Sequence, residues 1–295
     1  MDDELQEVRD NFYVGNFQRT MQLCDKASAG SDIAQNECDA IKGRCCLSLE
    51  DMASLKVMKE SNCPGQRAAS YMALASKSKT EQTRVAAKER LLKHAEETQD
   101  MNSCMLAASA LARDGSFQEA INMTQAHPTL EMQALRVFFY LMCNQVGMAE
   151  NQLKEADSSD DTAAFRMAQA ATHLYAGNSD EAYLTYCDLV TQFPTAEGDE
   201  SSNGSVLLQT GKGVANMQKK VWEEAVEDLQ RANKEAPEDP SILTNLCTCM
   251  VHQGKKDEFQ AYYAKLEQVA PQNPYVLKTQ SIGQVFAGFK ASLKA

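Results

Sequence analysis

The stretch 222–274 contains one pattern twice. The first copy reads WEEAVEDLQRANKEAPEDP from residue 222, and the second reads FQAYYAKLEQVAPQNP from residue 259. Pro237 and Pro240 of the first copy recur 34 residues later as Pro271 and Pro274. Proline cannot continue the hydrogen-bond ladder of a helix, so each copy marks a place where a helix ends. The pattern therefore predicts helical hairpins that repeat every 34 residues.

This period, with fitted residues on the second helix of each hairpin, is typical of tetratricopeptide repeats. Ala225 and Leu229 take those positions in the first copy, and Phe259 and Tyr263 take them in the second. A helical hairpin cannot bury both apolar faces alone, so the hairpins stack. The sequence predicts an all-α, TPR-like α-solenoid, a right-handed superhelix of stacked helical hairpins.

The position of Ala225 can be traced back along the chain at intervals close to the repeat period. The expected hairpin contacts are Thr20, Leu55, Ala87, Ala120, Ala149, Ala182, Ala225 and Phe259. The sequence therefore predicts a single solenoid over residues 1–295.

Departures from the period suggest a division of this solenoid. The run PTAEGDESSNG from residue 194 is polar and rich in helix breakers, which predicts a mobile loop. An acidic run at 155–161 predicts a second loop. The expected parts are divergent hairpins over 1–194, a polar loop insertion at 195–205, the two clearest repeats at 206–274 and a capping helix at 275–295.

Charge and cysteine content restrict the classes of function. The chain carries 41 acidic against 29 basic residues, a net charge of −12, which disfavours binding to nucleic acid or to anionic lipid. The acidic N-terminus lacks the features of a secretory signal, so we expect a cytoplasmic protein. Its ten cysteines fall mostly within expected amphipathic helices, and we expect buried thiols rather than a metal site or disulfides.

The sequence shows no set of residues suited to catalysis. The four histidines lie on different repeats, without carboxylates at ligand spacing. The run Thr210-Gly211-Lys212-Gly213 lacks the upstream glycine and the hydroxyl residue of a phosphate loop, and Gly213 fits a close-packing position on the first helix of a hairpin. We expect no enzyme activity and no cofactor.

The N-terminal run DELQEVRDNFYVGNFQ, residues 3–18, resembles the opening of the coatomer epsilon subunit family. The resemblance returns at WEEA (222–225), at EAPEDPSILTNL (235–246) and at QVFAGF (284–289). It implies a non-catalytic subunit of the COPI vesicle coat, whose superhelix closes around a segment of the alpha subunit's C-terminal region. It also implies a cytosolic complex that is peripheral on Golgi membranes and COPI-coated vesicles, and that supports Golgi-to-ER retrograde and intra-Golgi transport.

A partner segment would contact the concave surface formed by the first helix of each hairpin. The residues expected to line that surface are Met105, Phe138, Leu141, Met167, Ala171, Tyr175, Val214, Met217, Thr248 and His252. Methionine suits an adaptable groove because it is flexible and polarizable.

Two alternatives belong to other classes of function. A TPR co-chaperone or adaptor would capture a C-terminal peptide with a clamp of lysine and asparagine, and only Lys212 is well placed for one. A hydrolase or transferase built on helical repeats would need polar groups that converge on one site.

Overall fold

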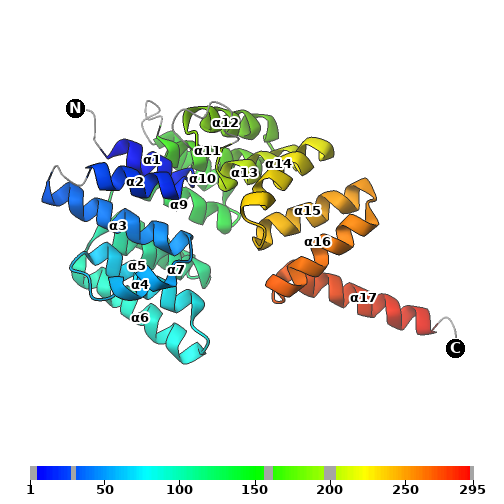
Figure 1. Cartoon of the computed structure of the whole chain (residues 1–295), viewed down its shortest axis with the longest axis horizontal. Coiled ribbons are helices and arrows are strands. Elements are labelled where there is room, and N and C mark those ends of the chain that lie inside the picture. Colours follow the sequence, from blue (N-terminus) through cyan, green and yellow to red (C-terminus); the bar gives the residue numbers. More distant parts are fainter. Residues whose placement is uncertain (1–4, 28–30, 156–161, 196–203, 293–295) are drawn as a thin grey trace. The chain divides into compact units, whose positions relative to one another are not determined.

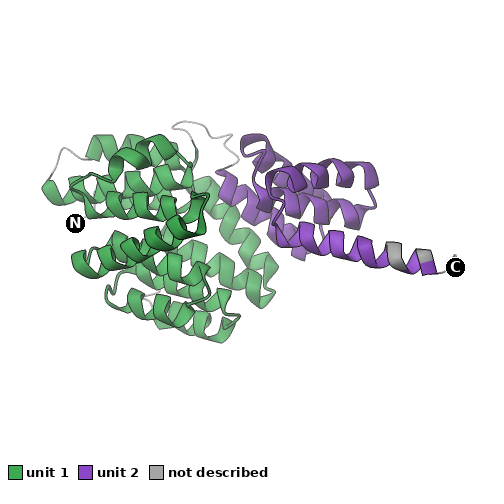
Figure 2. Ribbon diagram, turned by 90° about the horizontal axis from the view of Figure 1, so that it is seen from below, with its two compact units in different colours: residues 1–202 green, residues 203–295 purple. Residues whose placement is uncertain are grey.

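The computed structural model describes residues 5–27, 31–155, 162–195 and 204–292. These residues form seventeen α-helices and no strands (Figure 1). The chain divides into two compact units, residues 1–202 and 203–295, which Figure 2 shows in green and purple. The loops expected at 195–205 and 155–161 fall almost wholly outside the described residues.

Helical spacing in the sequence predicts helices such as 222–235, 240–253 and 256–269, and the structure has helices at those residues. The helices of unit 1 are α1 (Gln6–Tyr13), α2 (Phe17–Ala27), α3 (Asp32–Ser48), α4 (Met52–Met58), α5 (Pro64–Lys77), α6 (Glu81–Thr98), α7 (Met101–Arg113), α8 (Phe117–Gln125), α9 (Leu130–Met142), α10 (Val146–Glu155), α11 (Ala163–Ala176) and α12 (Ser179–Gln192). Those of unit 2 are α13 (Val206–Gln218), α14 (Trp222–Glu235), α15 (Pro240–Gln253), α16 (Lys256–Val269) and α17 (Pro274–Ser292).

Side-chain caps fix several helix starts. The Asp100 carboxylate accepts from the Ser103 N–H at 2.8 Å at the start of α7. Asp239 accepts from the N–H groups of Ser241 and Ile242, and Pro240 supplies the first turn of α15. Each cap satisfies a donor that the helix itself leaves free, worth about 1 kcal/mol.

The repeat positions traced through the sequence are the contacts that hold the hairpins together. Seven of the eight are buried, namely Thr20, Leu55, Ala87, Ala120, Ala149, Ala182 and Ala225, while Phe259 is partly buried. Ala225 packs with Leu229 and Leu246 in the core of unit 2. Gly213 has the close-packing role expected of it, because a Cβ there would lie 2.7 Å from Leu229 Cγ.

Unit 1 closes on itself, because its first hairpin is bonded to its last. The N–H of Ala163, the first residue of α11, donates to Asp10 Oδ1 of α1 at 2.9 Å. Asn16 Nδ2 donates to the Phe193 carbonyl at 3.2 Å, and an Arg19 guanidinium nitrogen donates to the Pro194 carbonyl at 3.2 Å. Helix α1 therefore meets both α3 and α11.

Unit 2 consists of two hairpins, α13–α14 and α15–α16, followed by α17. The start of α17 packs on α15 and α16 through Val276, which is buried with Leu243 and Leu266. Beyond this contact α17 runs on as a single helix (Figures 1 and 2). The sequence predicts that the last helix caps the stack, and in the structure the start of α17 makes this contact.

Candidate partner-binding surfaces

The candidate residues of unit 1 do not line an open groove. Met105, Leu141 and Met167 are buried. Phe138 and Ala171 are partly buried in a cluster that joins α9, α10 and α11. Of the six, only Tyr175 near the end of α11 is exposed. A partner could reach the buried three only if unit 1 opened.

Helix α1 and one arginine fill the interior of unit 1. The Tyr13 hydroxyl lies 3.8 Å from Met105 Sδ, and the Tyr13 ring packs in the same cluster as Phe138. Arg44 of α3 is buried, with its guanidinium carbon 4.2 Å from the centroid of the Phe12 ring. This guanidinium donates to the Tyr13 hydroxyl at 3.1 Å and to Asn102 Oδ1 at 3.2 Å.

Sequence reasoning missed this interior. Its signal is present in the α3 run AIKGRCCLS, where Arg44 stands among small and apolar residues of an otherwise buried helix face. A buried guanidinium needs acceptors and aromatic faces around it, because an unpaired buried charge is costly. Such a residue indicates that another element must cover it, and here that element is α1.

In unit 2 the repeat register places apolar residues at one position of α13, α15 and α17, and this position is exposed on α15 and α17. Leu208, Ile242 and Val276 recur every 34 residues and are all buried. Helices α13, α15 and the start of α17 therefore turn the same side toward the core of unit 2. Positions nine residues further on lie on the opposite side of each helix, at 100° per residue. These positions are occupied by Met217, Val251 and Val285.

The surface that results is open on α15 and α17. Val251 is 57 % exposed and Val285 is 70 % exposed, while Met217 is partly buried. Three residues earlier the register places Val214, Thr248 and Ile282, of which the first two are partly buried and the third is exposed. We call these six residues the open face of unit 2: Val214, Met217, Thr248, Val251, Ile282 and Val285. It includes three of the four residues predicted in this unit.

His252, the fourth, stands at the edge of the open face. Its ring is stacked on that of Trp222, with centroids 4.1 Å apart and planes inclined by 7°. Trp222 begins α14 and packs against the core of unit 2, as expected from its place at the start of a second helix. The stack holds the exposed imidazole against α14.

Lys212, the residue that a peptide-capturing clamp would use, points into unit 2. Its Nζ lies 3.5 Å from Asp228 Oδ1, and Asp228 is buried. Asp228 also accepts from Asn216 Nδ2 at 3.1 Å and from an Arg231 guanidinium nitrogen at 3.2 Å. Because Lys212 is engaged in this network between α13 and α14, it does not offer its charge to a peptide carboxylate.

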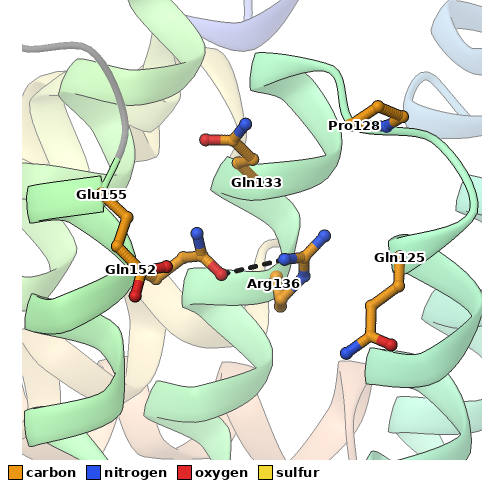
Figure 3. Close-up of a pocket in the computed structure, with 6 residues that line it drawn as sticks. All are labelled: Gln125, Pro128, Gln133, Arg136, Gln152 and Glu155. Carbon is orange, nitrogen blue, oxygen red and sulfur yellow. Dashed lines mark hydrogen bonds between the residues drawn. The ribbon is translucent and has the colours of Figure 1, made fainter.

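A polar cavity of about 400 Å³ lies among α8, α9 and α10 (Figure 3). Its lining residues are Gln125, Pro128, Gln133, Arg136, Gln152 and Glu155. Arg136 donates to the Thr124 hydroxyl and carbonyl at 3.1 and 3.2 Å and to Gln152 Oε1 at 3.0 Å. The guanidinium therefore ties the three helices together, and the lining contains no nucleophile.

The ten cysteines are free thiols, and most of them are buried. Eight of the ten are buried, and Cys143 and Cys187 are partly buried. Burial raises the pKa of Cys45 to about 12 and those of Cys247 and Cys249 to about 11. The prediction of buried thiols is confirmed for these eight. Among the described residues, no group of three or more His, Cys, Asp or Glu side chains could hold a metal ion.

Stacked hairpins with close contacts at the repeat positions define a TPR-like helical repeat protein. Solved structures agree on this fold. A chain in the crystal structure of the APC/C hetero-tetramer Cut9-Hcn1 gives a TM-score of 0.61, with 10% identity, over 90% of this chain and 52% of that chain. A tetratricopeptide repeat protein from Parabacteroides merdae gives 0.55, with 14% identity, over 88% of this chain and 97% of that chain.

Sequence comparison identifies the family. The family model described as "Coatomer epsilon subunit" matches residues 1–293. Coatomer subunit epsilon-1 of Arabidopsis thaliana is 25% identical over 286 residues, covering 95% of this chain and 93% of the relative. Coatomer subunit epsilon-1 of Oryza sativa subsp. japonica is 27% identical over 283 residues, covering 95% and 94%. The chain belongs to the coatomer epsilon subunit family, and is a component of the hetero-oligomeric COPI coat.

The family and the repeat fold point to a structural role. In the part of the chain that the structure describes, no helix is both long and apolar enough to span a membrane.

Proposed function

We propose that this chain binds and stabilises the C-terminal region of the coatomer alpha subunit. In this way it would support Golgi-to-ER retrograde and intra-Golgi vesicle transport, without catalysing a reaction. Its membrane association would be indirect, through the coat, and its location cytoplasmic, on Golgi membranes and COPI-coated vesicles. The net charge of −12 supports the indirect route, since an acidic chain is not drawn to an anionic leaflet.

The observation that carries the proposal is the open face of unit 2. Helices α13, α15 and α17 carry apolar side chains at one repeat position, and Val251 on α15 and Ile282 and Val285 on α17 are exposed. Large apolar side chains that are exposed on a folded protein, and that recur at one repeat position, indicate a surface for a partner. A partner that covers it removes this surface from water, at roughly 25 cal/mol per Å².

Within this proposal, the candidate residues divide by their accessibility. Val214, Met217, Thr248 and His252 are the contacts that need no rearrangement, and Val251 joins them. Phe138, Ala171 and Tyr175 of unit 1 are secondary contacts. Met105, Leu141 and Met167 would join only if α1 moved out of the interior of unit 1.

Calorimetric titration of the full chain with the alpha subunit's C-terminal region tests the proposal. Val251→Asp should weaken binding by about tenfold or more, because it places a charge in an apolar contact. Val57→Asp is the matched control, because Val57 is 77 % exposed on α4 in unit 1. This control should bind as the wild type does.

Salt dependence adds a second measurement. Apolar burial is only weakly screened, so the affinity should change little between low and high salt. The proposal fails if the wild-type chain does not bind the alpha subunit's region. The site assignment fails if Val57→Asp and Val251→Asp have equal effects.

A further inference from the structure

The second half of α17 carries an apolar stripe that nothing in unit 2 covers. Ile282, Val285, Phe286 and Phe289 recur at the i, i+3, i+4 and i+7 spacing of one helix face. All four are exposed, Phe286 at 69 %. Two of them, Ile282 and Val285, belong to the open face of unit 2, so the stripe extends that surface along α17.

The repeat register shows that this stripe does not serve packing within a hairpin. In α15, Leu246 and Met250 are buried against α14, and they join this helix to the core. The residues 34 positions later in α17 are Gln280 and Gln284, which are exposed. Helix α17 has thus lost the apolar side that α15 buries.

The opposite change occurs on the other side of the helix. Phe286 stands at the register position of His252, and Phe289 at that of Lys255. His252 of α15 and Lys255, which follows that helix, are therefore replaced by aromatic residues in α17, on the side that faces away from the hairpin contact.

The backbone of this half is also weak as an isolated helix. A Cβ placed on Gly283 would meet nothing within 4 Å, so no close approach requires a glycine at this position. A glycine inside a helix disfavours the helical conformation relative to alanine. A helix that is weak alone and apolar on one side gains order when a partner covers that side.

Charge identifies the chemistry of the partner. Residues 274–292 contain Lys278 and Lys290 and no acidic residue, in a chain with a net charge of −12. A second copy of the chain would bring lysines against lysines in an antiparallel or parallel pairing. An interfacial membrane helix carries a strongly basic polar face, whereas the polar side of α17 is mostly Gln, Ser, Thr and Gly.

We propose that the second half of α17 binds an apolar stretch flanked by Asp or Glu, in the same partner that covers the open face of unit 2. Phe286 and Phe289 anchor the apolar stretch, and Lys278 and Lys290 face its acidic flanks. This inference rests on the proposed function, because it assigns the far end of the same binding surface.

Binding of the full chain to the alpha subunit's C-terminal region tests the inference. Phe286→Asp should lower the affinity by about tenfold or more, since aromatic anchors carry much of the energy of an interface. Gln284→Asp is the matched control, with the same new charge on the other side of the same helix. It should change the affinity by less than about twofold.

Lys290→Glu tests the acidic flanks. It should weaken binding about threefold to tenfold at low salt, and the loss should shrink at high salt because exposed charges are screened. Circular dichroism of the free variants should match the wild type, which separates lost binding from lost folding.

The outcomes separate this inference from the function it rests on. If Phe286→Asp binds like the wild type while Val251→Asp does not, the alpha subunit remains the partner and the role of α17 is wrong. If the wild-type chain does not bind the alpha subunit's region, both the proposed function and the role of α17 are wrong. The inference is also overturned if Phe286→Asp abolishes only self-association in sedimentation, or only binding to phosphatidylserine vesicles.

Discussion

The two units use the same hairpin in different ways. In unit 1 the first helices of the hairpins turn their inner sides toward Tyr13 and Arg44, and α1 fills the interior. In unit 2 the corresponding sides of α15 and α17 remain exposed. The comparison shows that a repeat alone does not make a binding surface. A helix face that the stack leaves exposed can bind a partner only where no other element of the same chain covers that face.

The largest expected effect is the unfolding of one unit without the other. Ala225→Arg forces a long charged side chain into the buried contact among α13, α14 and α15, at a cost of more than about 3 kcal/mol. Unit 2 should unfold while unit 1 keeps its structure, because each is a compact unit. Hydrogen exchange should show protection lost in α13–α16 and retained in α3–α11.

Ala261→Arg is the control for that substitution. Ala261 is exposed on α16, so the same side chain can extend into solvent and protection should be unchanged. Loss of protection in both units with Ala225→Arg would show that they fold as one.

The second effect concerns the interior of unit 1. Arg44→Met removes the guanidinium that lies on Phe12 and bonds Tyr13 and Asn102, and leaves those partners buried without it. We expect a loss of about 2–4 kcal/mol in the free energy of unfolding of unit 1, measured in urea. Arg90→Met, on an exposed part of α6, should cost less than about 0.5 kcal/mol. An Arg44→Met protein as stable as the wild type would mean that α1 does not depend on this contact.

The smallest effect concerns the junction between α1 and α11. Burial raises the pKa of the Asp10 carboxyl, although the Ala163 N–H and Gln6 favour its charged form. The folded state therefore holds the proton more tightly than the unfolded state does. Ionisation of Asp10 lowers the stability of unit 1 as the pH rises from the unfolded pKa through the folded one.

Asp10→Asn removes that titration and keeps an acceptor for the Ala163 N–H. At pH 7 the variant should be as stable as the wild type or more stable, by less than about 1 kcal/mol. The difference should shrink as the pH falls through the raised folded pKa, because the buried wild-type carboxyl then takes up its proton. Urea unfolding at several pH values measures it, and a difference that grows at acid pH would contradict the assignment.

Much of the fold could be predicted because repeats act locally. Caps, prolines and helical periodicity set helices such as 222–235 and 240–253 at the residues found in the structure. The spacing of Ala225 and its equivalents then identified the hairpin contacts. Each of these signals lies within one repeat of the contact it predicts.

The interior of unit 1 could not be predicted, because its contacts join distant parts of the chain. Asp10 meets Ala163, and Asn16 meets Phe193, and nothing in either local pattern points to its partner. For that reason Met105, Leu141 and Met167 were expected on a groove although they are buried. In the described part of unit 2, Val214, Met217 and Thr248 are partly buried, and their role as partner contacts stays a prediction.

The bond between Asp10 and Ala163 also bears on how the protein is made. The two residues are 153 positions apart, so α1 leaves the ribosome long before its partner exists. At about 5–20 residues per second, the wait is on the order of 8–30 s. During that time Tyr13 lacks the side chains of α9–α11 that pack near it in the folded unit. We expect α1 to dock last, and pulse-labelled hydrogen exchange during refolding would show its amides protected after those of α3–α9. Until α11 has been synthesised, the nascent unit 1 has no partner for Asp10 at Ala163 and cannot close.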